Sequence, residues 1–188
     1  MTLHSDVTEL LAEAGILDVD VDDAVADEHD HEHVRSSAYQ RVVSVIASSR
    51  SRDRDRAIVA TILRDPDEMG SKTAVVALVD GIAWKVTGPA EFRQWSAELL
   101  PEIDQLKTEA YREFIRRRIH DWLFYLSIED GHMPTPAELA KATDWMQRFL
   151  AEHSTSLAVL ALVAESANTR KTRNIAKNRA GSRKLRTK

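Results

Sequence analysis

The apolar residues of this chain recur at intervals of three and four positions over most of its length. That spacing places them on one side of an α-helix, so it predicts amphipathic helices and not strands, whose inward positions alternate. A shorter segment, Leu157 to Glu165, is apolar nearly all round and predicts a buried helix. The longest stripe predicts a single helix of about seven turns; its members are Ile103, Leu106, Ala110, Phe114, Ile119, Trp122, Leu123 and Leu126.

Residues that typically begin helices separate these stripes. Thr135-Pro136-Ala137-Glu138 has the pattern of a capping box with proline in the first turn, and it should start one helix whose stripe continues to Leu150. Asp65 is expected to cap the helix that follows it, with Glu68 three residues on. Further helix starts are expected at Ser36 or Ser37, Pro89, Pro101, Ser156 and Asn168. About seven or eight helices with short turns predict an all-α fold, either an irregular helical bundle or a HEAT-like helical stack.

Residues 73–86 allow two interpretations. Asp80-Gly81 between apolar runs is typical of a hairpin turn. The run 74–79, however, lacks the alternation of a strand, and its apolar positions fit a helical stripe that continues to Val86. We therefore favour a helix here.

Charge divides the chain more sharply than hydropathy does. Residues 1–34 hold eleven Asp and Glu and no Lys or Arg, whereas residues 166–188 hold nine Lys and Arg and no acid. The net charge of −4 hides this separation. We expect a largely disordered acidic head over 1–34, a helical domain over 35–180 and a basic disordered tail over 181–188.

Composition and missing motifs narrow the functional classes. The 188 residues contain no cysteine, which excludes thiolate catalysis and fits a reducing, cytoplasmic environment. The longest uninterrupted apolar run is far shorter than the roughly 20 residues that span a bilayer, so no membrane association is expected. We find no glycine-rich phosphate loop, nucleophile elbow or zinc-hydrolase motif, and the sequence indicates neither a cofactor nor an enzyme.

The acidic head contains the densest set of metal-ligating residue types. His29, His31 and His33 alternate with acids, and imidazole suits zinc, nickel or copper. A stable site also needs a rigid frame, which an acidic linker does not supply, so these histidines are weak candidates. The nearby Asp18-Val19-Asp20-Val21-Asp22 lacks the glycine and the final glutamate of a calcium loop.

Basic side chains are the candidates for contact with a polyanion. Residues 157–179 have a second interpretation as a helix-turn-helix, with Thr169–Arg179 as the recognition helix, although its turn lacks the usual glycine. The candidate contacts are Arg170, Lys171, Arg173, Lys177, Arg179, Arg183, Lys184 and Arg186, with Arg116 and Arg117 as a second set.

Two functions follow from these features. The first is a non-catalytic scaffold or adaptor domain that docks an unknown protein partner on a helical face. The alternative is an accessory or regulatory protein that binds DNA or RNA through its basic C-terminal helix and tail. The sequence fixes neither the partner nor the oligomeric state.

Overall fold

The computed structural model describes residues 2–26 and 32–182, with the side chains of Glu32 and His33 left out. Within these ranges the chain forms eleven α-helices and no strand, which confirms the all-α class. It divides into two compact units, Met1–Ile119 and His120–Lys188. Over the part of the chain that is described, no helix has the length and apolarity needed to span a membrane.

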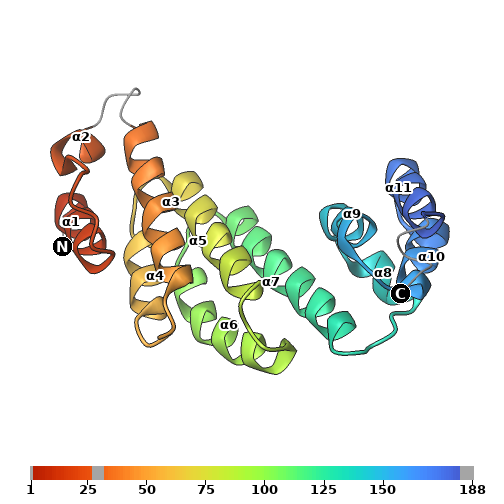
Figure 1. Ribbon diagram of the computed structural model, residues 1–188. Helices are drawn as coiled ribbons and strands as arrows, with labels where there is room; N and C mark the ends of the chain where they lie inside the picture. Colours follow the sequence, from red (N-terminus) through yellow and green to blue (C-terminus); the bar gives the residue numbers. More distant parts are fainter. Residues whose placement is uncertain (1, 27–31, 183–188) are drawn as a thin grey trace. The chain divides into compact units, whose positions relative to one another are not determined.

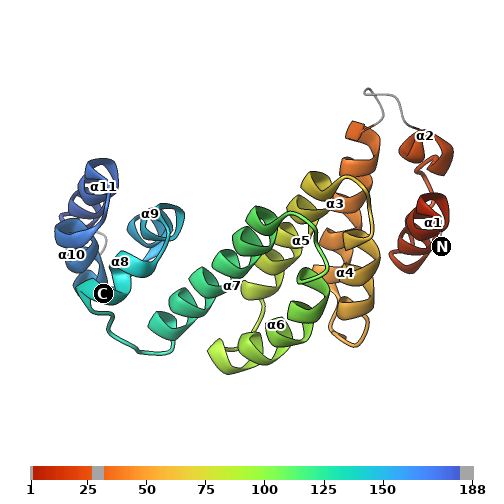
Figure 2. The ribbon, with the colours of Figure 1, turned by 180° about the vertical axis from the view of Figure 1, so that it is seen from behind.

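The first unit is built around two layers of helices. Its elements are α1 (Leu3–Glu13), α2 (Val21–Val25), α3 (Glu32–Ser48), α4 (Asp55–Leu63), α5 (Glu68–Ala83), α6 (Pro89–Ile103) and the start of α7 (Glu109–Glu129). Helices α3 and α5 lie side by side in one layer, and α4 and α6 pair in the other (Figures 1 and 2). Consecutive helices from α3 to α6 therefore alternate between layers.

The core of this unit confirms the helical interpretation for residues 73–83, although α5 ends at Ala83 and does not continue to Val86. Val75, Leu78, Val79 and Ile82 are all buried on α5. A Cβ atom built on Gly81 would lie only 2.9 Å from the Cβ of Ala47. Glycine is present here because α3 and α5 approach closely, and not because the chain turns.

The second unit comprises the end of α7 followed by α8 (Pro136–Lys141), α9 (Asp144–His153), α10 (Leu157–Ser166) and α11 (Arg170–Ala180). The capping box at Thr135 is present with both of its hydrogen bonds. Ser156 caps α10, as the sequence predicts. Helices α9, α10 and α11 pack on one another around buried Met146, Leu160 and Val163.

Several expected helix boundaries are wrong. Pro101 does not begin a helix but lies inside α6, two residues before its end. Residues 104–108 then interrupt the long helix expected from Ile103, so α7 begins at Glu109. The stripe from Leu139 to Leu150 is likewise broken, because Thr143 caps the separate helix α9.

Two expected caps also differ from the structure. Asp67 and not Asp65 caps α5, by accepting from the backbone N–H groups of Met69 and Gly70. Asp65 is instead buried. Thr169 and not Asn168 caps α11.

The described part of the acidic head contains secondary structure. Helices α1 and α2 both lie within residues 1–34, and α1 buries Val7, Leu10 and Leu11. His29 and His31 fall outside the described residues, and of His33 only the backbone is described.

Candidate functional site

The first unit contains a groove of about 880 Å³. It lies between α1, the turn from α4 to α5, the turn from α6 to α7, and Tyr111 near the start of α7. Its volume is in the range of ligand-binding clefts. Three polar interactions fix the loops that form it.

The first interaction joins α1 to the end of α4. Arg64 donates to both carboxylate oxygens of Asp6, from Nη2 at 2.8 Å and from Nε at 3.3 Å. The negative charge of Asp6, which lines the groove, is therefore compensated by Arg64. A fork of this kind fixes orientation as well as distance.

The second interaction is a buried network centred on Asp65. Its Oδ2 accepts from the Tyr39 hydroxyl at 2.6 Å and lies 3.0 Å from Arg35 Nε. Its Oδ1 accepts from the backbone N–H of Asp67 at 2.7 Å. Burial, and then the hydrogen bond to Asp65, raise the pKa of Tyr39 above its ordinary value. All these groups are occupied in holding α3 against the α4–α5 turn.

The third interaction joins α5 to the two residues that precede α7. The Glu68 carboxylate accepts from the backbone N–H groups of Lys107 at 2.6 Å and Thr108 at 3.1 Å. Hydrogen bonds from Thr108 and Lys107 lower the pKa of Glu68. The acids on this side of the groove therefore bind backbone N–H groups or pair with arginine.

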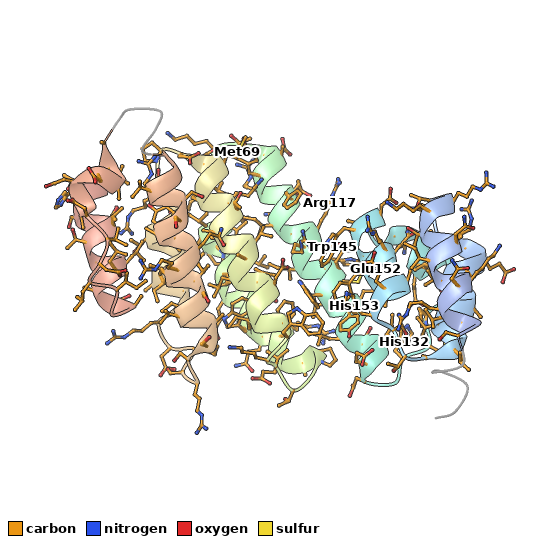
Figure 3. All side chains as sticks on the ribbon, turned by 45° about the horizontal axis from the view of Figure 1, so that its top comes forward. Met69, Arg117, His132, Trp145, Glu152 and His153 are labelled. Carbon is orange, nitrogen blue, oxygen red and sulfur yellow. The ribbon has the colours of Figure 1, made fainter. Side chains whose placement is uncertain are left out.

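Exposed apolar side chains continue from the groove along α5 and α7. Met69, 59% exposed, lines the groove, and Phe114 is 46% exposed. The Lys72 ammonium lies 5.2 Å from the Tyr111 ring centroid and 4.8 Å from that of Phe114, within cation–π range. We call Met69, Tyr111 and Phe114, together with Lys72 that contacts both rings, the apolar rim. Figure 3 shows Met69 at the start of α5 and Arg117 extending from α7.

The second candidate surface is helix α11, and the structure separates its bases into two groups. Arg173 donates to the carbonyl oxygens of Ala167 and Asn168 just after α10, and Arg179 donates to that of Ala151 at 3.1 Å. Both arginines are therefore engaged by backbone carbonyl groups, one in α9 and the others in the segment between α10 and α11. Arg170, Lys171 and Lys177 are exposed instead.

The other predicted contacts have mixed outcomes. Arg116 forms ion pairs with Asp104 and with Glu113, so its charge is compensated. Arg117 is exposed. Arg183, Lys184 and Arg186 lie outside the described residues. Within the part of the chain that the structure describes, no three ligand-type side chains converge as a metal site would require.

Sequence reasoning missed the aromatic cluster of the second unit. Trp145, Phe149 and His153 repeat every four residues along α9; the first pair stack at 5.5 Å and the second lie 4.4 Å apart between ring centroids. Trp122 from α7 meets Trp145 and Phe149 edge-on, at 5.8 and 5.3 Å. Figure 3 shows Trp145 and His153 on α9. The four-residue spacing was the available signal, and it describes packing of α9 on α7.

The remaining buried carboxylates have structural partners. Asp55 accepts from Trp95 Nε1 at 2.9 Å and from Arg52 at 3.0 Å, and burial raises its pKa. Asp121 accepts from the backbone N–H and the hydroxyl of Thr143, the residue that caps α9.

Comparison of the chain with protein-family models, with curated proteins and with solved structures finds no match.

Proposed function

We propose that this protein is a cytoplasmic, non-catalytic interaction domain that docks a protein partner on the groove and apolar rim of its first unit. The observation that carries the proposal is exposed Met69 in the lining of a groove of about 880 Å³, with exposed Phe114 linked through Lys72 to Tyr111 of the same lining. Exposed apolar side chains that gather beside a concavity are typical of interaction sites, whereas singly scattered ones are not. The alternation of helices between two layers supports a HEAT-like stack, an architecture that presents such surfaces.

The charges around the rim indicate the chemistry of the partner. Asp6 and Glu68 are engaged by Arg64 and by backbone N–H groups. Lys107 and Arg117 are exposed at the groove and on α7. The partner that fits is a peptide segment with an apolar anchor for the rim and acidic residues beside it.

The test uses the double variant Met69→Glu/Phe114→Glu. Both side chains are exposed, so the substitutions should leave folding intact while placing two carboxylates where an acidic, apolar segment would bind. The control Val45→Glu/Leu100→Glu changes two apolar side chains of the same unit, 44% and 37% exposed, to the same charge.

Wild type and both variants are immobilised in parallel, and proteins from the source cells that wild type retains are identified by mass spectrometry. A partner is accepted only when its purified form binds wild type and the control equally, and binds the rim variant at least tenfold more weakly by calorimetry. Equal binding to all three proteins, or no protein retained by wild type, would show that the rim is not a docking surface.

A further inference from the structure

The exposed side of α11 carries bases and amides and nothing else. Arg170, Lys171, Asn174, Lys177 and Asn178 are all exposed. At 3.6 residues per turn these five positions cover an arc of about 120°. Among the described residues, the side chains of Arg170, Lys171 and Lys177 have no hydrogen-bond or ion-pair partner.

The opposite side of the same helix anchors it. Thr172 and Ala176 are buried, and Ile175 is half-buried. Arg173 and Arg179 are held by the carbonyl groups they cap. The exposed bases can therefore be changed without touching the anchor, and a ligand would meet a helix that is already fixed in place.

Charge also distinguishes the unit that carries this face. His120–Lys188 contains eleven Lys and Arg and seven Asp and Glu, whereas Met1–Ile119 contains 15 and 23. Four of the eleven bases lie in residues 183–188, so the local excess of positive charge at α11 comes from residues 166–182, which contain five Lys and Arg. Residues 166–182 contribute no acid to offset the field of α11.

We infer that the exposed face of α11, Arg170, Lys171 and Lys177 with Asn174 and Asn178, binds duplex DNA. Arg170 and Lys177 are about 10 Å apart along the helix axis, comparable with the ~12 Å width of the DNA major groove. The lysine and arginine side chains would contact phosphates. The two asparagines between them carry amide groups that can hydrogen-bond to the edges of the DNA bases.

Other partners fit this face less well. It has no aromatic side chain, so it offers no platform on which the bases of a single strand would stack. The major groove of double-stranded RNA is too narrow and deep for a helix. A protein partner would need an apolar centre, and none of the five side chains supplies one.

The experiment measures binding of the full chain to a random 20-base-pair DNA duplex by fluorescence anisotropy at 50 and 200 mM salt. The test variant is Lys171→Gln/Lys177→Gln. The control is Lys85→Gln/Lys141→Gln, which removes the same charge from exposed lysines on other parts of the chain. Circular dichroism checks that all three proteins have the same helix content.

Removing one lysine–phosphate interaction should reduce the slope of log K against log salt by about 0.9. Between the two salt concentrations, the affinity of wild type should therefore fall about 12-fold more than that of the test variant, which lacks two such interactions. The control should follow wild type. All three proteins have the same basic residues after Ser182, so the contribution of those residues cancels when the salt dependences of the affinities are compared.

Three results would overturn the inference. If wild type does not bind the duplex at 50 mM salt, the exposed face of α11 is not a site for duplex DNA. A test variant with the salt dependence of wild type or of the control would place binding elsewhere in the chain. Tighter binding to the single strand, to duplex RNA or to an acidic peptide than to the DNA duplex would identify a different ligand.

Discussion

The buried network around Asp65 offers the sharpest test of how the first unit is held together. The substitution Asp65→Asn removes the negative charge from a side chain that is 0% exposed, while its ion-pair partner Arg35 is only 10% exposed. The carboxylate accepts from three directions, including the Tyr39 hydroxyl and the backbone N–H of Asp67. An asparagine has one acceptor oxygen, so its NH₂ group must face a donor.

The expected cost follows from that burial. Breaking a buried ion pair by neutralising one partner costs about 3–5 kcal/mol, because the remaining charge is left in a poorly solvated site. Tyr39→Phe removes one hydrogen bond to the same carboxylate and should cost roughly 1 kcal/mol. Since domains have about 5–15 kcal/mol of stability in total, Asp65→Asn should bring the first unit close to unfolding.

Urea unfolding followed by circular dichroism gives the free energies, and hydrogen exchange of peptides from α3 to α5 localises the effect. The matched control is Asp18→Asn, which removes an ion pair of 2.6 Å with Arg41 that is largely exposed. Solvent screens that pair, so little change is expected. If Asp65→Asn destabilises the protein no more than Asp18→Asn does, the reasoning about burial is refuted.

Three further predictions concern single polar groups. Gln147→Leu leaves two carbonyl groups and one N–H without their partner and should cost about 3 kcal/mol in urea unfolding of the second unit. Because the pKa of Glu68 is lowered in the folded state, the stability advantage of wild type over Glu68→Gln should be present above pH 4.5 and vanish as the pH falls through the lowered value. Burial raises the pKa of Asp55, so the sign is opposite: relative to Asp55→Asn, wild type should lose stability as the pH rises above 3.8, measured by unfolding at a series of pH values.

Local signals in the sequence predicted local structure well. The capping box at Thr135 and the cap at Ser156 depend on residues three positions apart, and both are present. Pro101 shows where such reasoning fails. Proline is favoured in the first turn of a helix and disfavoured inside one, yet α6 accommodates Pro101 two residues before its end.

Tertiary contacts decided the features that could not be predicted. Asp65 and Asp67 look equivalent as caps, but Arg35 and Tyr39, about 30 residues upstream, bind one of them. The candidate site shows the same dependence. Composition identified α11 as basic, whereas only the positions of carbonyl groups on other segments show that Arg173 and Arg179 are engaged.

The interaction of Glu68 with Lys107 and Thr108 has a consequence for synthesis on the ribosome. The carboxylate that binds the two residues before α7 belongs to α5, 39 and 40 residues earlier in the chain. Helix α5 therefore leaves the exit tunnel before Lys107 and Thr108 do, so the Glu68 carboxylate is available to accept their hydrogen bonds as they emerge. The turn that precedes α7 can therefore be fixed against α5 during translation, before the rest of the chain has been made.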